Sequence, residues 1–563
     1  MIYHCEDHTC NYWDEGEKLP ERCPQCGRKL LRANEADMTG DDWTALGNTL
    51  WYAEASDKKR MVDCFRKAAY LGSAWGVCNL GICMEQGNGV EADPVQAFWL
   101  YQQAVEMGSL NAVCCLGVCY QYGIGTAPDA KQAAELYCKA AEYGSPRGQM
   151  LLAHAFHDGI GVEADAAEAV HWVRAAAYQR YGEGMHRLGV CYEYGDGVEQ
   201  NWEHAVHWFR EAAESGVSAA MTDLGYCYEK GCGVEQSWEQ AFSWYRRGAE
   251  CGNPVSMSNL GLCYKRGYGV EQNWQEAIKW YEQGAQCGDL QSMHNLACCY
   301  ERGEGVEQNE ERALYWYRRG AEAGSDYCMY CLGWNYSNGE GVEQNMTEAI
   351  RWYTAAAEGG NADAMHNLGW HYDHGEGVEQ DMKKAICWYE RAAEQNHPAA
   401  MNSLGECYAM GRGVPRDLET AMEWYRRAAE LGEAMADYNM GWHLEQAGKL
   451  SEAYAHYRKA ADGNDDSAWW ALGRFYENGV VVAQDGKEAR RCYETGEKLG
   501  SVKCKMRLAR CKLLGIGGRR AKKAGLDLCR QALELAKESS EKEDYGYEAE
   551  MNLLRRTIAE NES

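Results

Sequence analysis

The sequence predicts an all-α fold, a solenoid of about 12 to 14 helix-turn-helix repeats of 36 residues. The first observation is a Leu-Gly pair that returns with this period. Its copies are Leu80-Gly81, Leu116-Gly117, Leu188-Gly189, Leu224-Gly225, Leu260-Gly261, Leu332-Gly333, Leu368-Gly369 and Leu404-Gly405, and Leu152-Ala153, Leu296-Ala297 and Met440-Gly441 keep the same register. A fixed period of this size is typical of units that bury their apolar faces only against their neighbours.

A column of tryptophans repeats with the same period. Its members are Trp172, Trp208, Trp244, Trp280, Trp316, Trp352, Trp388 and Trp424. The third observation is a Gly-x-Gly turn between the two columns, for example Gly231-Cys232-Gly233. Because these features share one period, every unit is expected to have the same structure.

The first helix of a unit is predicted by its apolar spacing. In residues 219–252 the apolar positions are Met221, Leu224, Cys227 and Tyr228. They lie at i, i+3, i+6 and i+7, which form one stripe of a helix. Gly231 and Gly233 then end this helix, because glycine adopts the left-handed conformation without a steric penalty.

The second helix is predicted to begin with a capping box, in which the side chains of two residues three apart bond each other's backbone N–H groups. Ser237 and Gln240 have this spacing. The same spacing occurs at Asn273 with Glu276, Asn345 with Glu348, and Asp165 with Glu168. The apolar stripe that follows is Ala241, Trp244, Tyr245 and Ala249. Each unit is therefore a helix, a glycine turn and a second helix.

The pattern Leu-Gly-x-x-Tyr-x-x-Gly-x-Gly-Val, followed by Ala-x-x-Trp-Tyr-x-x-Ala-Ala-x-x-Gly, resembles the Sel-one-like repeat (SLR) family, a relative of the tetratricopeptide repeat. The resemblance extends over roughly residues 40 to 535 and is weakest at both ends. It implies a right-handed α-solenoid that acts as a protein-interaction scaffold. It implies no catalytic residues, so we expect a protein that is not an enzyme.

Four cysteines, Cys5, Cys10, Cys23 and Cys26, precede the first repeat, and such pairs can converge on one tetrahedral metal ion. The stretch from Cys10 to Cys26 is similar to the rubredoxin-like ribbon of rubrerythrins, which binds iron, and related ribbons hold structural zinc. Four residues separate Cys5 from Cys10 where that ribbon has two. We expect zinc, with iron as the alternative metal and His8 as the alternative fourth ligand.

The predicted domain organisation has three parts. Residues 1–32 form a zinc-ribbon or rubredoxin-like segment, residues 33–535 form the repeat solenoid, and residues 536–563 form a capping helix and tail.

Composition argues against several classes of partner. The formal charge is −28, from 57 Lys and Arg against 85 Asp and Glu, which opposes binding to nucleic acid and to anionic membranes. No apolar run approaches the roughly 18 residues that span a bilayer, and the start MIYHCEDHTC lacks the pattern of a secretion signal. We expect a cytoplasmic protein, and its oligomeric state stays open.

The chain has 27 cysteines, but their positions do not indicate a disulfide framework. One column, three residues after the Leu, contains Cys119, Cys191, Cys227, Cys263, Cys299 and Cys407. This is a position in the helix core, where a reduced thiol acts as a small apolar side chain. A cysteine-rich branch of the SLR family pairs cysteines within each unit and is associated with β-lactam binding. This chain lacks a regular second cysteine per unit.

The binding surface is expected on the concave face. In tetratricopeptide proteins the groove is lined by first-helix positions two before and two after the Leu, and the residue just before the Leu contacts the backbone of the ligand. The predicted partner-binding residues at these positions are Tyr330, Trp334, His366, Asn367, Trp370, Tyr438, Asn439, Trp442 and Trp470. Large aromatic side chains with a polar edge are common anchors, so we expect an unidentified protein or peptide to bind here.

Two other groups of residues have open interpretations. His366, His371 and His374 are expected to form a polar surface cluster, or otherwise a weak metal site. Residues 503–530 contain ten Lys or Arg against Asp527 alone. This basic segment is either a solvated capping helix or a docking surface for an acidic partner, including an acidic face of another copy.

The sequence therefore predicts a protein–protein interaction scaffold with a metal-binding amino terminus. The first alternative is a redox adaptor, in which iron in the ribbon passes electrons to a protein docked on the solenoid. The second is a secreted cysteine-rich SLR protein that interacts with β-lactams, which would require oxidised cysteines.

Overall fold

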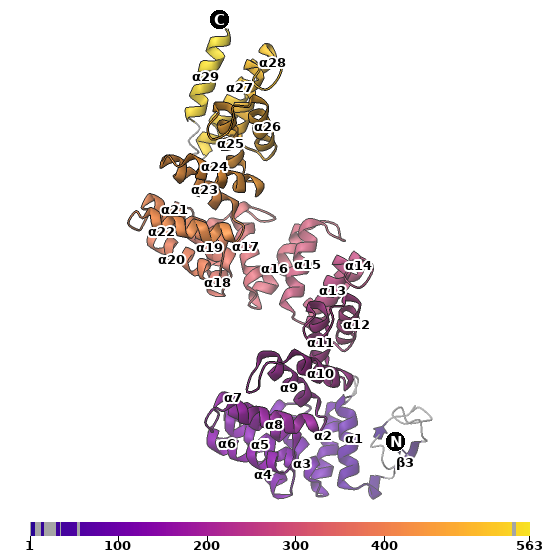
Figure 1. Cartoon of the computed structure of the whole chain (residues 1–563). Helices are drawn as coiled ribbons and strands as arrows, with labels where there is room; N and C mark the ends of the chain where they lie inside the picture. Colours follow the sequence, from indigo (N-terminus) through magenta and orange to yellow (C-terminus); the bar gives the residue numbers. More distant parts are fainter. Residues whose placement is uncertain are drawn as a thin grey trace. The chain divides into compact units, whose positions relative to one another are not determined.

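The computed structural model describes residues 2–5, 13–15, 30–33, 35–52, 57–542 and 548–562. The chain divides into two compact parts, each of which contains several two-helix repeats. From here on, the first unit is Met1–Ser292 and the second unit is Met293–Ser563. Within the described residues there are 29 α-helices, and helices α1 to α27 have 13 residues each. In each unit, consecutive helices form pairs that stack on one another (Figure 1).

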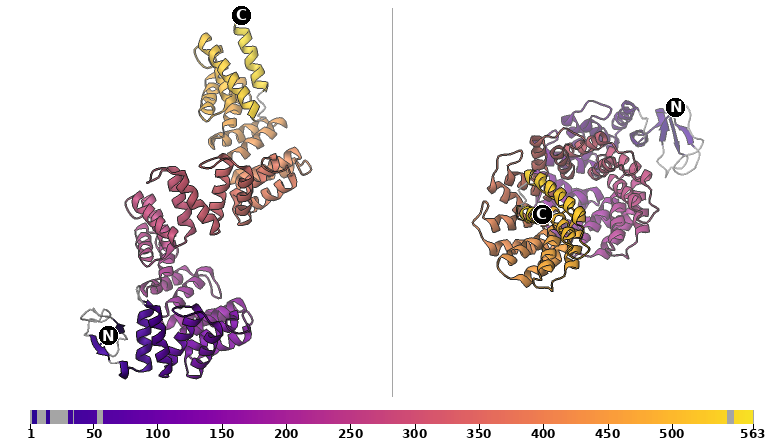
Figure 2. Two further views of the ribbon diagram at one scale, coloured as in Figure 1. Left: turned by 180° about the vertical axis from the view of Figure 1, so that it is seen from behind. Right: turned by 90° about the horizontal axis from the view of Figure 1, so that it is seen from above.

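The first unit begins with a small sheet. Its strands are β1 (Ile2–Cys5), β2 (Trp13–Glu15) and β3 (Leu30–Ala33), followed by the 3-10 helix η1 (Glu35–Asp37). β1 lies between β2 and β3 and is antiparallel to both, and β2 contacts the first helix (Figure 2). The helices are α1 (Gly40–Tyr52), α2 (Lys58–Tyr70), α3 (Ala74–Gln86), α4 (Pro94–Glu106), α5 (Leu110–Tyr122), α6 (Ala130–Glu142), α7 (Pro146–Asp158), α8 (Ala166–Tyr178), α9 (Gly182–Tyr194), α10 (Trp202–Glu214), α11 (Ser218–Lys230), α12 (Trp238–Glu250), α13 (Pro254–Arg266) and α14 (Trp274–Gln286).

The second unit begins within α15 (Leu290–Arg302) and is helical throughout its described residues. Its further helices are α16 (Glu310–Glu322), α17 (Asp326–Asn338), α18 (Met346–Glu358), α19 (Ala362–His374), α20 (Met382–Glu394), α21 (Pro398–Met410), α22 (Leu418–Glu430), α23 (Ala434–Gln446), α24 (Leu450–Asp462), α25 (Asp466–Asn478), α26 (Gly486–Lys498), α27 (Val502–Leu514), α28 (Lys522–Lys542) and α29 (Glu548–Glu562). The pairs from α1–α2 to α27–α28 confirm the predicted all-α solenoid of two-helix repeats.

A buried aromatic ring explains the glycine of the Leu-Gly pair. Tyr245 on α12 is 1% exposed, and its ring lies so close to Gly225 on α11 that an added Cβ would be 2.6 Å from Cε1. The other buried rings of this column are Phe65, Tyr101, Tyr137, Phe209, Tyr281, Tyr317, Tyr353, Tyr389, Tyr425, Tyr457 and Tyr493. Where the column holds the smaller Val173, the Gly position holds Ala153, and both lie in one core cluster. In this repeat a smaller side chain in one column is accompanied by a larger one in the other, whereas Ala297 and Tyr317 occur together in another repeat.

The tryptophan column is less buried than predicted. All eight indoles are only partly buried, whereas the residue that follows each of them is fully buried. Adjacent helical residues point about 100° apart, so only one of the two can face the first helix of the unit. The indoles lie at the edge of the core instead, where Arg247 lies 4.1 Å from the ring centroid of Trp244 and Arg391 lies 4.3 Å from that of Trp388.

The turn between the helices needs both of its glycines. Gly231 has φ 75° and donates its N–H to the carbonyl of Cys227, which caps α11. Gly233 has φ 69°, and a Cβ there would collide with the carbonyl oxygen of Trp202 in the preceding repeat. The second glycine therefore lets each turn pack closely against the repeat before it.

Only half of each predicted capping box forms. The Ser237 side chain accepts from Gln240 N at 3.3 Å, and Asn273 and Asp165 accept in the same way at their own helices. The N–H of Ser237, however, donates to the carbonyl of Tyr228 at 2.9 Å. Because that backbone bond to the first helix already uses the N–H, the reciprocal bond from the side chain three residues later has no donor.

The first helices of the repeats lie on the inner side of each curved unit. Several successive first helices contact one another, which are α1 with α3, α3 with α5, α5 with α7 and α11 with α13 in the first unit, and α25 with α27 in the second. Within the described residues, no two successive second helices approach to the same extent. Helices on the inner side of a curved stack lie closer together, so the first helices form the concave face.

The predicted cysteine column is buried in the repeat cores. All six of its members are buried, and none forms a disulfide bond among the described residues. Burial raises the pKa of Cys227 and Cys263 to about 12 and that of Cys407 to about 11. A high pKa leaves little thiolate at neutral pH, so these side chains act as apolar core residues.

The carboxyl-terminal boundary predicted at residue 535 falls inside α28. Cys529, Ala532 and Ala536 on this helix belong to one apolar cluster with Leu513 on α27 and Leu554 on α29. The contacts of α28 continue on both sides of residue 535, so one helix crosses the predicted boundary.

Candidate partner-binding groove

Three tryptophans of the concave face are exposed to solvent. Trp334 on α17 is 45% exposed, Trp370 on α19 is 39% exposed, and Trp442 on α23 is 38% exposed. Each lies two residues after a buried residue of the repeat core, which is Leu332, Leu368 or Met440. All three predicted anchors therefore lie on first helices of the second unit with much of their indole surface accessible.

Neighbouring histidines orient two of these indoles. The Trp370 ring stacks on His374, with ring centroids 4.3 Å apart and an angle of 22° between the planes. The Trp442 ring meets His443 edge to face, at 4.7 Å and 82°. Side chains held in one orientation lose less conformational entropy when a ligand binds, which favours their use as anchors.

The predicted tyrosines are partly buried against the second helix of their own repeat. The Tyr330 ring lies 6.0 Å from that of Tyr353, and the Tyr438 ring lies 5.6 Å from that of Tyr457. Burial raises the pKa of Tyr330, and it raises that of Tyr438 to about 12. These tyrosines form the floor of the groove rather than free anchors.

One of the predicted backbone-binding asparagines already has partners inside the chain. Asn439 donates to Asn402 Oδ1 at 3.0 Å and to Glu406 Oε1 at 3.2 Å, both on α21. A ligand that used this amide group would have to exchange existing hydrogen bonds for new ones, which gives a modest net free energy.

The histidines of α19 do not form the predicted surface cluster. His371 is buried, and its Nδ1 lies 3.0 Å from the carbonyl oxygen of Glu376. His366 instead stacks on His397, with centroids 5.1 Å apart. Burial and the neighbouring His397 lower the pKa of His366 to about 4. The helix turns these side chains in different directions, because residues 366 and 371 are five apart.

Sequence reasoning missed a partly buried charge cluster that includes a residue of α19, the helix of Trp370. Asp373 is 4% exposed and accepts from Arg412 Nη1 at 2.9 Å, and Arg412 Nη2 lies 3.7 Å from Glu406. Burial raises the pKa of Glu406. Among the Gly-x-Gly turns of the sequence, only Gly411-Arg412-Gly413 has a basic residue between its two glycines. This exception could have pointed to the charge cluster.

Trp470 is covered by the carboxyl-terminal helix. Its Nε1 donates to Glu550 on α29 at 3.3 Å, and Arg474 and Lys503 lie 4.6 and 5.3 Å from the centre of its ring. The groove position that Trp470 occupies is therefore filled by a segment of the same chain.

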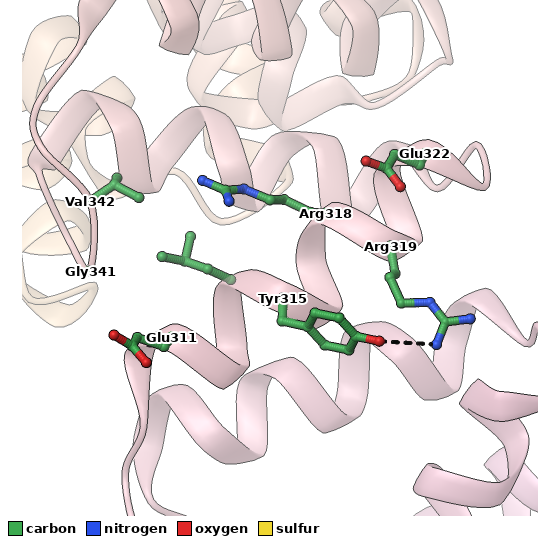
Figure 3. Close-up of a pocket in the computed structure, with 8 residues that line it drawn as sticks. Glu311, Tyr315, Arg318, Arg319, Glu322, Gly341 and Val342 are labelled. Carbon is green, nitrogen blue, oxygen red and sulfur yellow. Dashed lines mark hydrogen bonds between the residues drawn. The ribbon is translucent and has the colours of Figure 1, made fainter.

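A pocket of about 400 Å³ lies on the second-helix side of the same unit. Its walls are formed by Glu311, Leu314, Tyr315, Arg318, Arg319 and Glu322 of α16 and by Gly341 and Val342 of the following turn (Figure 3). Arg319 donates to the Tyr315 hydroxyl at 3.4 Å, and Arg318 donates to Tyr336 at 3.1 Å. Two arginines and two glutamates give it no net charge preference, and none of the predicted site residues lines it.

Most of the predicted metal ligands lie outside the described residues. These are His8, Cys10, Cys23 and Cys26, and of Cys5 only the backbone, in β1, is described. In the sheet register, Cys5 pairs with Leu30 of β3 and His4 pairs with Trp13 of β2. Among the described side chains, no cluster of three or more His, Cys, Asp or Glu has metal-binding geometry.

None of the described helices is both long and apolar enough to cross a bilayer.

The comparisons with known proteins agree with the repeat architecture. The family model "Sel1 repeat" matches twelve segments between residues 76 and 501, which are 76–109, 112–145, 146–181, 182–217, 218–253, 254–289, 290–325, 326–361, 362–397, 398–433, 434–465 and 468–501. No curated protein matches the chain.

Two solved structures illustrate the similarity. Protein c5321, a protective antigen of uropathogenic Escherichia coli strains that displays an SLR fold, is 30% identical over 85% of this chain and 97% of its own, with a TM-score of 0.51. A Sel1 repeat protein from Oxalobacter formigenes is 33% identical over 44% of this chain and 99% of its own, with a TM-score of 0.41. With twelve matched repeats, the chain belongs to the Sel1 repeat family.

Proposed function

We propose that this protein is an interaction scaffold that binds a partner polypeptide along the first helices α17 to α23. Sel1 repeat solenoids generally act as scaffolds for protein–protein interactions, and the present proposal assigns the binding face. The observation that supports it most is the exposure of Trp334, Trp370 and Trp442 at one repeat position. Monomeric surfaces rarely expose several large aromatics in one row unless these bind something.

The repeat architecture does not itself require an indole at this position. The same position holds Val118 and Leu262 in the first unit and Glu406 between Trp370 and Trp442. A position that accepts aliphatic, acidic and aromatic side chains is not fixed by packing. The three indoles therefore fit a role in recognition better than a role in folding.

The experiment compares capture of the native partner by the immobilised wild-type chain and by a Trp334→Ala, Trp370→Ala, Trp442→Ala variant. We expect the variant to lose capture while its thermal unfolding changes little. Trp352→Ala is the matched control, because Trp352 is a partly buried indole on the second helix of the Trp334 repeat. It should retain capture. Full capture by the triple variant would show that the partner binds elsewhere.

We also propose that Cys5, Cys10, Cys23 and Cys26 hold one structural zinc ion. The strand register supports this, because β1 ends at Cys5 beside Leu30, and His4 lies beside Trp13. The segment that contains Cys10 thus joins β1 to β2 at the Cys5 end of the sheet, and the segment that contains Cys23 and Cys26 reaches Leu30 of β3 at the same end. Four thiolates would leave no open coordination position, so the site would stabilise the sheet and not catalyse.

Metal analysis of the purified chain tests this second proposal. We expect one zinc per chain and none in a Cys23→Ser, Cys26→Ser variant, with the solenoid unfolding unchanged because each repeat is stabilised by its neighbours. A red protein that contains iron would support the redox alternative. Equal metal content in the variant and the wild type would rule out this site.

A further inference from the structure

The carboxyl-terminal helix α29 lies in the groove at the end of the second unit. Its apolar residues Met551 and Leu554 are buried against Met506, Ala509 and Leu513 of α27 and against α28. α29 contacts both helices and runs alongside them (Figure 1). At its far end, Arg520 donates to Asn561 Oδ1 at 2.6 Å.

A carboxylate on α29 is bound by groove residues of two repeats. Glu550 accepts from Arg507 Nε at 2.6 Å and from Arg507 Nη2 at 2.7 Å, and it also accepts from the Trp470 indole. The side chains of Arg507 and Glu550 are 14% and 8% exposed. A two-point guanidinium–carboxylate bond that is largely removed from water is geometrically specific and stronger than a neutral hydrogen bond.

These contacts use the positions that line the groove elsewhere. Trp470 lies two residues before Leu472, as Tyr330 lies before Leu332, and Arg507 lies directly before Leu508, as Asn439 lies before Met440. The contact to Trp470 reaches α25, which belongs to the repeat before α27. α29 therefore packs against α27 and α28 and also contacts groove positions of two successive repeats.

Basic side chains lie around Glu550, and one of them, Arg507, is shared with Glu477. Lys503 and Arg474 both flank the Trp470 ring, and Arg507 also contacts Glu477 at 3.3 Å. Arg510 forms an ion pair with Glu477 as well. Part of the basic segment 503–530 thus binds a carboxylate. This fits the interpretation of the segment as a docking surface for an acidic partner better than its interpretation as a solvated capping helix.

We propose that the surface of Trp470, Lys503 and Arg507 is a binding site for an acidic amphipathic helix, and that α29 occupies it as a ligand within the same chain. A partner helix with a carboxylate among apolar residues must then displace α29. This proposal rests on the proposed function, because the partner helix would bind the same groove.

The test uses the full chain and a matched pair of variants on α29. Glu550→Gln removes the bound carboxylate, and Glu548→Gln changes an exposed glutamate two residues away. We expect Glu550→Gln to speed amide hydrogen exchange in residues 548–562 roughly 10- to 100-fold and Glu548→Gln to leave it unchanged. A labelled peptide of residues 548–562 should bind the Glu550→Gln chain at least tenfold more tightly than the wild type.

Adding Arg507→Gln to the Glu550→Gln chain should abolish binding of the peptide. The proposal is overturned if the peptide does not bind the Glu550→Gln chain, or if exchange in α25 to α28 rises as much as exchange in α29. The second outcome would make α29 a structural cap. Neither readout involves Trp334, Trp370 or Trp442, so loss of the proposed groove function would leave this test interpretable.

Discussion

The two units share their internal packing and differ on their concave surface. In both, a Tyr or Phe of the second helix lies against the Gly of the Leu-Gly pair, as at Tyr245 with Gly225 and at Tyr457 with Gly441. The position two residues after the Leu differs. In the first unit it holds Ile82, Val118, His154, Val190, Tyr226 and Leu262, and in the second it holds Cys298, Trp334, Trp370, Glu406, Trp442 and Arg474.

The difference follows from what each position costs to change. The ring fills a closed space between two helices, so a smaller or larger side chain there costs several kcal/mol. The groove position is bounded by solvent, where substitutions usually change stability by less than about 0.5 kcal/mol. The repeat thus fixes the fold in both units and leaves the groove of the second unit open to acquire binding residues.

The largest expected effect tests the shared packing. Tyr245→Ala in the first unit and Tyr457→Ala in the second should each lower the free energy of unfolding by about 3–5 kcal/mol, because each empties a closed aromatic site. Denaturant unfolding, followed with hydrogen exchange, measures both. A large effect in one unit and none in the other would mean that the buried ring stabilises only one of the two units.

The matched controls keep the ring and remove only its hydroxyl. Tyr245→Phe loses the bond from the hydroxyl to Glu229 Oε2 at 2.8 Å, and Tyr457→Phe loses the bond to Glu445 Oε2 at 2.7 Å. Each should cost about 1–2 kcal/mol. A cost equal to that of alanine would assign the role of these residues to the hydrogen bond instead of the ring.

Periodicity predicted the repeats well because most helix boundaries have a local chemical cause. The Leu-Gly pair, the Gly-x-Gly turn and the polar residue at the start of the second helix each recur, and the structure confirms the helices they predict. Depth was harder. Trp244 and Tyr245 recur together, and no local signal says that the tyrosine is buried and the indole is at the edge.

Contacts outside the period could not be predicted. Glu550 and Arg507 are 43 residues apart, and Glu550 and Trp470 are 80 apart. Neither distance is a multiple of the repeat, and α29 itself carries no copy of the repeat pattern. For the groove, the sequence identified Trp334, Trp370 and Trp442 as exposed candidates, but it did not reveal that Trp470 lies beneath α29.

The second expected effect is an acid sensitivity confined to the second unit. The pKa of His366 is about 4, against an ordinary value of 6.5, because burial and His397 disfavour its charged form. Between these values the unfolded chain binds a proton that the folded chain does not. His366 therefore contributes fully above pH 6.5, and on the order of 3 kcal/mol is lost as the pH falls from 6.5 towards 4.

Asp363, which faces His366 and His397, acts in the same direction. Its hydrogen bond with His397 lowers its pKa, so its contribution is present above its ordinary pKa of 3.8 and is lost at lower pH. The protection factors for hydrogen exchange in α19 and α21, corrected for the pH dependence of the intrinsic rate, should fall between pH 6.5 and 4; this loss of protection is the acceleration measured. The first-unit helices α11 and α13, with Thr222 and Ser258 at the equivalent position, are the control. His366→Gln should remove the acceleration above pH 4, and its persistence there would assign it to another group.

The smallest expected effect concerns the match between glycine and ring. Gly225→Ala places a Cβ 2.6 Å from the Tyr245 ring, and Gly333→Ala in the second unit places one 2.6 Å from the Tyr353 ring. Overpacking costs about 1–3 kcal/mol, and the better helix propensity of alanine offsets about 1 kcal/mol of it. A net loss of about 1 kcal/mol is therefore expected in both units. The fold tolerates this combination, because Ala297 and the buried Tyr317 occur together in one repeat of the native protein. A small destabilisation is therefore expected rather than a large one.

The native pair of Ala153 and Val173 provides the rescue. In a double-mutant cycle, Gly225→Ala should destabilise the wild type but stabilise a Tyr245→Val chain, because the added methyl group then fills part of the space left by the ring. The coupling free energy, measured by denaturant unfolding, should exceed about 1 kcal/mol. If the two changes are additive instead, the glycine is present for helix geometry alone, and the volume match between the two columns is not what the two units share.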